Sequence, residues 1–200
     1  EYLLSNNFEV EVLSPDNYQK SVINSKFNGK MKFHHTKFEN FTSQKKFDLI
    51  FESESACYIK IDAGFKKARE VLNNQGYLLA SDYFVFNEDS SGSPHLKSSH
   101  RMNEYLSSAE ENNFQLIKEY DQTENTMPTL DYAQYFLDRF ISPAIDYGSY
   151  SAKKNYPIIS NMIKRVIGSK WDKKKEQLDL INSQEFRKYR KYMIYLFQKK

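Results

Sequence analysis

Strand-like and helix-like segments alternate at short intervals over the first 120 residues, and this alternation limits the possible folds more than any other feature. Alternating apolar residues at 8–13 predict a strand, and the helix-start signal Ser14-Pro15-Asp16 follows directly. The apolar run 47–53 and the amphipathic run 62–72 repeat this order. Such alternation is typical of crossover units, so we predict an α/β fold with a mostly parallel sheet.

Two of the predicted strands end in polar side chains. The apolar run 77–80 leads into Asp82 and Tyr83, and the run 47–53 leads into Glu54. In open α/β sheets, ligands bind beyond the carboxyl ends of the strands. We therefore predict that these side chains converge on one cleft. Two other interpretations stay open, because Asp82 can form an Asx turn and acids near Glu54 can favour the start of a helix.

The segment after residue 121 is rich in aromatic side chains. The stretch PTLDYAQYFLDRFISPAI predicts a helix whose aromatic face carries Tyr132, Tyr135, Phe136 and Phe140. This face is either core or the wall of an apolar substrate site, and we predict that residues 126–161 cover the cleft as a lid. The Ser-rich stretch 87–100 is a second lid candidate, in which His95 or His100 could act as a base.

Composition restricts the class of protein. The 200 residues suit one domain, and fifteen Tyr with fifteen Phe argue against disorder. A net charge of +3 does not by itself indicate nucleic-acid binding. Cys57 is the single cysteine, which excludes an intrachain disulfide, and the adjacent His34 and His35 point to opposite faces of a strand, so we predict no metal site.

Targeting signals are absent from the 200 residues. The sequence holds no apolar run of about eighteen residues and no signal peptide, so we expect a cytoplasmic protein without a membrane span. Residues 1–4 look like the end of a helix, and we expect the natural protein to begin upstream of Glu1.

Several motifs together resemble one known family. FDLIFESESACYI and FKKAREVLNNQGYLLASDYF look like the second half of the class I S-adenosylmethionine-dependent methyltransferases. FEVEVLSPDNYQ resembles their second strand and the helix after it, and FQLIKEYDQT with YMIYLFQ resembles the antiparallel strand pair that closes their sheet. The resemblance implies a Rossmann-like fold in a single domain, 1–200, with 121–190 as a helical insert that covers the substrate.

The resemblance also implies site residues. It assigns cofactor binding to positions at or just after the ends of three strands: Leu13, Ser14, Lys37, Phe38, Glu52 and Ser53. Glu54 and Asp82 would be catalytic. Substrate binding would fall to Tyr58, Tyr83, His100, Tyr132 and Phe136.

The sequence also departs from the family in three places. The glycine-rich loop and the central strand before it have no counterpart, so we predict a gap between the strands at 8–13 and 47–53. The acid that commonly closes the second strand is absent, because Val12 and Leu13 stand there, and Lys37 replaces an acid after the third strand.

The resulting hypothesis is an enzyme that uses S-adenosylmethionine to methylate a small, largely apolar molecule, such as a lipid, quinone or sterol. Two alternatives remain. The missing loop and acids favour a non-catalytic or truncated binding module of the same fold, and the basic C-terminal third favours an RNA or tRNA methyltransferase. An upstream segment or a second chain would complete the sheet.

Overall fold

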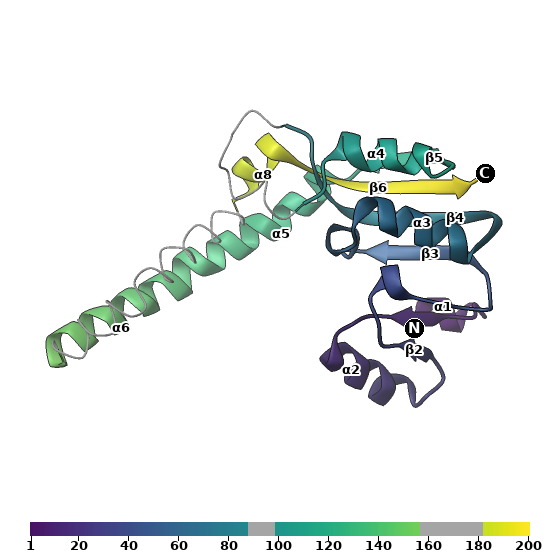
Figure 1. The fold of residues 1–200 in the computed structure, drawn as a ribbon. Helices are drawn as coiled ribbons and strands as arrows, with labels where there is room; N and C mark the ends of the chain where they lie inside the picture. Colours follow the sequence, from purple (N-terminus) through teal and green to yellow (C-terminus); the bar gives the residue numbers. More distant parts are fainter. Residues whose placement is uncertain (88–98, 157–181) are drawn as a thin grey trace. The chain divides into compact units, whose positions relative to one another are not determined.

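The computed structural model describes residues 1–87, 99–156 and 182–200 (Figure 1). Internal contacts divide the chain into two compact units. The first unit holds residues 1–80, 105–118 and 195–200, and the second holds 81–104 and 119–194. Each unit is described by itself. The predicted lid residue His95 lies outside the described residues, as do most of the loop 87–100 and residues 157–161 of the predicted cover.

The strands form two separate sheets. β1 (Glu11–Leu13) pairs in parallel with β2 (Lys32–His34), with Val12 opposite Phe33. The larger sheet has the order β3 (Phe47–Ser53), β4 (Leu72–Val85), β6 (Arg190–Lys199) and β5 (Phe114–Asp121). Figure 1 shows the β6 arrow running opposite to β3. The predicted gap is confirmed, because β1 and β3 belong to different sheets and are not paired with each other.

The helices of the described residues are α1 (Tyr2–Ser5), α2 (Asn17–Phe27), α3 (Ile61–Val71), α4 (Met102–Glu111), α5 (Thr123–Phe136), α6 (Ser142–Asn155) and α8 (Ser183–Tyr189). Of these, the helices α1, α2, α3 and α5 fall on segments that the sequence predicted to be helical. A π-helical turn, Leu137–Ile141, joins α5 to α6, and the short 3-10 turns Phe38–Asn40 and Ala56–Tyr58 follow β2 and β3. No helix among the described residues is long and apolar enough to cross a membrane.

Two predicted boundaries are wrong. Helix α2 is capped by Asp16, whose Oδ1 accepts the Gln19 N–H at 2.7 Å, and not by Ser14. Strand β4 begins at Leu72 and continues to Val85, whereas the sequence predicted an end at Ala80. Asp82 therefore lies inside a strand and does not follow its carboxyl end.

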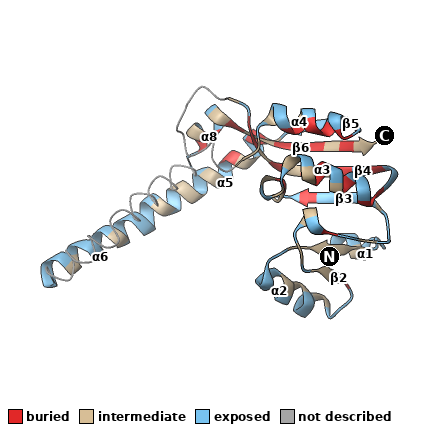
Figure 2. Ribbon diagram, viewed as in Figure 1, coloured by how far each residue is buried: buried red, intermediate tan, exposed pale blue. Residues whose placement is uncertain are grey.

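The core of the first unit is aromatic. The Phe65 ring on α3 lies 4.9 Å from Tyr105, 5.6 Å from Phe114 and 5.7 Å from Phe197, measured between ring centroids. Buried residues concentrate on α3, β4 and β6, whereas α2 has none (Figure 2). The buried core of this unit thus lies between α3 and the sheet.

Candidate functional site

A cavity of about 740 Å³ in the first unit is the candidate site. Its wall comes from β1, β3 and the segments that follow β1, β2 and β3. The residues that line it are Glu11 to Pro15, Gln19, His34, Lys37 to Glu39, Phe41, Phe47, Leu49 to Ser55, Tyr58, Ile59 and Val71. The cavity therefore extends to the carboxyl ends of two strands, where ligands bind in α/β proteins.

The six residues predicted to bind the cofactor all line this cavity. Leu13 ends β1, and the Ser14 N–H donates to the His34 carbonyl at 3.1 Å, which fixes the turn out of the strand. Lys37 and Phe38 come from the segment after β2, and Phe38 opens a 3-10 turn. The structure thus brings together residues that are up to forty positions apart.

The segment after β3 supplies two further predicted residues, Glu54 and Tyr58, which also line the cavity. Glu54 has a left-handed backbone, with φ of 48°. Such a conformation costs a residue with a β-carbon about 1–3 kcal/mol and is concentrated at functional sites. Tyr58 closes a 3-10 turn and is 82% exposed, so its ring is available to a ligand.

Glu52 lies on the opposite face of β3 from Phe51 and Ser53. The residue is 7% exposed, and its Oε2 accepts the Tyr105 hydroxyl at 3.4 Å. It lines the large cavity and also a smaller recess beside Phe65 and Gly64. Glu52 thus places a buried, hydrogen-bonded carboxyl group at the wall of the cavity.

The β1–β2 side of the cavity carries an ion-pair cluster. The Glu11 carboxylate lies 2.5 Å from His34 Nε2, 3.6 Å from Lys32 Nζ and 3.7 Å from Lys45 Nζ. Burial opposes ionisation of Glu11, but the hydrogen bond from His34 and the two lysines outweigh it, and the pKa of Glu11 is lowered. The Glu11 carboxylate is therefore already paired with side chains of the protein.

The Glu39 carboxylate is likewise held by hydrogen bonds within the protein. Burial acts to raise its pKa, yet its backbone hydrogen bonds, including the Lys60 N–H at 3.1 Å, lower the pKa overall.

The remaining predicted residues lie in the second unit and do not line this cavity. They are Asp82, Tyr83, His100, Tyr132 and Phe136. Asp82 is fully buried and accepts the Tyr83 N–H at 2.8 Å. The Tyr83 ring contacts Phe186, and the Arg190 guanidinium lies over it at 4.8 Å. Tyr132 is 71% exposed on α5. Their roles, and the lid role of 126–161, stay predictions.

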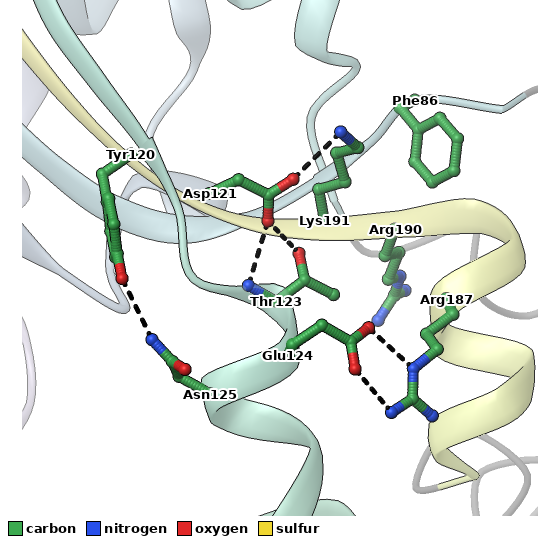
Figure 3. A pocket seen from close by; sticks show the side chains of 9 residues that line it. All are labelled: Phe86, Tyr120, Asp121, Thr123, Glu124, Asn125, Arg187, Arg190 and Lys191. Atoms are coloured by element: carbon green, nitrogen blue, oxygen red, sulfur yellow. Dashed lines mark hydrogen bonds and ion pairs between the residues drawn. The ribbon is translucent and has the colours of Figure 1, made fainter.

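A second cavity, of about 310 Å³, lies in the second unit and was missed by the sequence reasoning (Figure 3). Glu124 on α5 accepts two 2.9 Å bonds from Arg187 on α8, and Asp121 pairs with Lys191 at 2.9 Å. Asp121 also accepts the Thr123 hydroxyl at 2.6 Å. Glu124 and Arg187 are 63 positions apart in the sequence, and no local sequence pattern predicts that they pair.

The part of the chain that the structure describes holds no cluster of side chains suited to a metal ion. No group of three or more His, Cys, Asp or Glu side chains there could hold a metal ion. His34 contacts Glu11, and His35 Nε2 lies 2.9 Å from the Pro15 carbonyl, so the two rings are turned to different partners.

Comparison with known proteins rests on structure alone. No protein-family model matches the sequence, and no curated protein sequence matches it. A Galdieria sulphuraria protein described as a sarcosine dimethylglycine methyltransferase is similar over 98% of this chain and 72% of its own, with 12% identity and a TM-score of 0.67.

Two further solved structures extend the comparison. Geranyl diphosphate C-methyltransferase from Streptomyces coelicolor A3(2), solved with S-adenosyl-L-homocysteine, matches over 100% of this chain and 67% of its own, with 11% identity and a TM-score of 0.65. A [4+2]-cyclase matches over 96% and 66%, with 13% identity and a TM-score of 0.58.

Across the solved structures compared, this chain spans between 45% and 72% of the other protein's length. Several of those structures contain S-adenosylhomocysteine, so the shared fold is one that binds this cofactor. The chain has the Rossmann-like fold of the class I S-adenosylmethionine-dependent methyltransferases.

Proposed function

We propose that this chain belongs to an enzyme that transfers a methyl group from S-adenosylmethionine to a small, largely apolar molecule. The observation that carries the proposal is the cavity at the ends of β1 and β3. Six positions selected by family resemblance, scattered between Leu13 and Ser53, line that one cavity.

The residues present fit parts of the cofactor. Leu13 and Phe38 offer apolar surface to a purine base, and the Ser14 and Ser53 side chains can accept or donate hydrogen bonds at the rim. The Glu54 side chain, which also lines the cavity, offers an acidic group to a cationic ligand. When bound, S-adenosylmethionine supplies a methyl group on a positively charged sulfur.

The contribution of the chain to catalysis is then mainly orientation. Holding two reactants in an aligned geometry removes much of the barrier to a bimolecular displacement. Where the substrate nucleophile carries a proton, the Glu54 carboxylate at the mouth of the cavity would accept it. Exposed aromatic residues, such as Tyr58, would pack against an apolar substrate.

Binding of S-adenosylhomocysteine to the 200-residue chain, mapped by ¹H–¹⁵N NMR at millimolar ligand, tests the proposal. We expect shifts at Ser14, Phe38 and Ser53, and we expect Phe38→Ala to abolish them. Phe136→Ala, an exposed aromatic residue in the other unit, is the matched control and should leave them unchanged. Shifts confined to other regions would contradict the proposal.

A non-catalytic binding module is the second candidate. One specific observation favours it: Glu11, the acid of β1 that lines the cavity, is held by His34 and two lysines and is not presented to a ligand. Under this candidate, S-adenosylhomocysteine binds but no substrate is methylated. A third candidate, an RNA methyltransferase, predicts a salt-dependent shift of RNA in gels.

A further inference from the structure

The large cavity has two walls that come from different sheets. Lys37 and Phe38 follow β2, whereas Tyr58 and Ile59 follow β3, and all four residues line the cavity. No strand pairing joins these two sheets in the described parts of the chain. The position of one wall relative to the other therefore depends on contacts that side chains make.

Glu39 makes such a contact between the two walls. It lies in the 3-10 turn Phe38–Asn40 and itself lines the cavity. Its Oε1 accepts the Lys60 N–H at 3.1 Å, and the two residues are 21 positions apart in the sequence. Lys60 is the N-cap residue of α3, and its own side chain makes no capping hydrogen bond. A side chain on one wall thus holds the backbone that leads out of the other.

The Glu39 carboxylate is suited to this role because it is ionised at neutral pH. Burial acts to raise the Glu39 pKa, but hydrogen bonds from its own N–H and from the Lys60 N–H, together with the charges of Lys37 and Lys60, lower the pKa overall. A hydrogen bond to a charged group contributes more than a bond between neutral groups. The bond from Lys60 to Glu39 is therefore of the stronger kind.

Other contacts join the two sheets at a different place. Lys45 lies just before β3 and pairs with Glu11 on β1 at 3.7 Å, but the Lys45 side chain is 50% exposed, and exposed ion pairs contribute little. The rings of Phe41 and Phe47 pack with 6.1 Å between their centroids. Both contacts act near the start of β3, whereas the bond from Lys60 acts on the segment after the end of β3.

We propose that Glu39 is a positioning residue for ligand binding, because its bond to Lys60 fixes Phe38 relative to Tyr58 and Ile59 on the other wall. The inference rests on the proposed function in so far as the ligand is S-adenosylmethionine. Glu39 acts through its neighbours and needs only an acceptor oxygen for this role. Walls that are fixed in advance bind more tightly, because the ligand does not have to order them.

Titration with S-adenosylmethionine, followed by ¹H–¹⁵N NMR at pH 7, tests the inference. Glu39→Ala removes the acceptor and should weaken binding by about tenfold or more. Glu39→Gln keeps an acceptor oxygen and should stay within about threefold of wild type. Glu70→Ala is the matched control and should bind like wild type, because Glu70 pairs with Lys67 on α3 and does not line the cavity. Only signals of the folded chain are fitted, so a loss of stability alone does not change the measured affinity.

The donor can also be removed without a change to Glu39. Lys60 has φ of −63°, and Ile59 has φ of −97° and ψ of 131°, so the backbone accommodates Lys60→Pro. This variant lacks the N–H and should weaken S-adenosylmethionine about as much as Glu39→Ala does. Lys60→Ala keeps the N–H and is its control. The double variant Glu39→Ala with Lys60→Pro should be no weaker than either single variant, because both changes remove the same bond.

A measurement without ligand separates this inference from the proposed function. The Lys60 amide should exchange with solvent about tenfold faster in Glu39→Ala than in wild type. Relaxation dispersion, which reports slow motion of the backbone, should appear at Phe38 and Tyr58 in Glu39→Ala and in Lys60→Pro. It should be absent from wild type and from Glu39→Gln.

Three results would overturn the inference. The first is wild-type affinity in Glu39→Ala. The second is a Glu39→Gln variant as weak as Glu39→Ala, which would show that the negative charge of Glu39 acts on the ligand directly. The third is unchanged amide exchange and relaxation in Glu39→Ala, and this result counts even if wild type binds no ligand. Altered exchange in Glu39→Ala without any binding by wild type would contradict the proposed function and leave Glu39 as the residue that positions the two walls.

Discussion

At the scale of single residues, Glu11 gives the cavity wall a pH-dependent stability. Its pKa is lowered in the folded state, so its contribution to stability is complete above the ordinary value of 4.5 and is lost as the pH falls through the folded value. Glu11→Gln should lower the free energy of unfolding by about 1–3 kcal/mol at pH 7.

Urea denaturation at several pH values measures this effect. The difference between wild type and Glu11→Gln should be constant above about pH 5 and should shrink below 4.5. Glu9→Gln is the control, because the Glu9 side chain is 76% exposed and pairs only with Lys45 among the described residues. A difference that stayed constant down to pH 3 would contradict the assignment.

Glu54 carries backbone strain that two substitutions can measure. Both Glu54→Gly and Glu54→Ala remove the side chain, but only glycine adopts φ of 48° without penalty. We expect the glycine variant to be about 1–2 kcal/mol more stable than the alanine variant in chemical denaturation. At Lys66, an exposed position inside α3, the order should reverse by about 1 kcal/mol. The same order at both positions would argue against strain at Glu54.

At the scale of elements, α2 depends on its cap more than a core helix does. It buries none of its residues, so packing gives it little support. Asp16→Ala, which removes the acceptor for the Gln19 N–H, should destabilise the chain by about 0.5–2 kcal/mol in thermal unfolding, whereas Asp16→Asn should have almost no effect. Equal stability of the alanine variant would show that α2 is held in another way.

The errors at α2 and β4 show what sequence patterns cannot resolve. Ser14 and Asp16 are both good cap residues, and tertiary pairing decided between them, because the Ser14 N–H is bonded to β2. In β4, residues 73–76 read Asn-Asn-Gln-Gly, which are residue types common in turns, yet they lie inside the strand. The Asn73 amide donates to Asp48 at 2.7 Å in the neighbouring strand, and pairing with β3 and β6 extends β4 beyond the apolar run 77–80 in both directions.

The candidate site was predictable where it follows strand ends. Leu13, Lys37 and Glu52 were placed by family resemblance, and the ends of β1, β2 and β3 bring them to one cavity. The Asp82 prediction depended on a strand end at Ala80, and that end is wrong. Ion pairs between distant segments, such as Glu11 with His34, arise from the register of β1 and β2, which no local pattern encodes.

At the scale of the whole molecule, the gap between β1 and β3 should limit cofactor binding. Leu13 and Ser53 lie at the ends of two strands that no hydrogen bonds connect, so the rim is held less rigidly than in a continuous sheet. A ligand must then order the two sides of its own site, and that cost reduces affinity. Isothermal titration calorimetry of the 200 residues with S-adenosylmethionine should therefore give weak or undetectable binding, with a Kd of about 1 mM or higher.

Micromolar affinity of the 200 residues for S-adenosylmethionine would contradict this prediction. It would mean that the rim is already rigid, although β1 and β3 belong to different sheets.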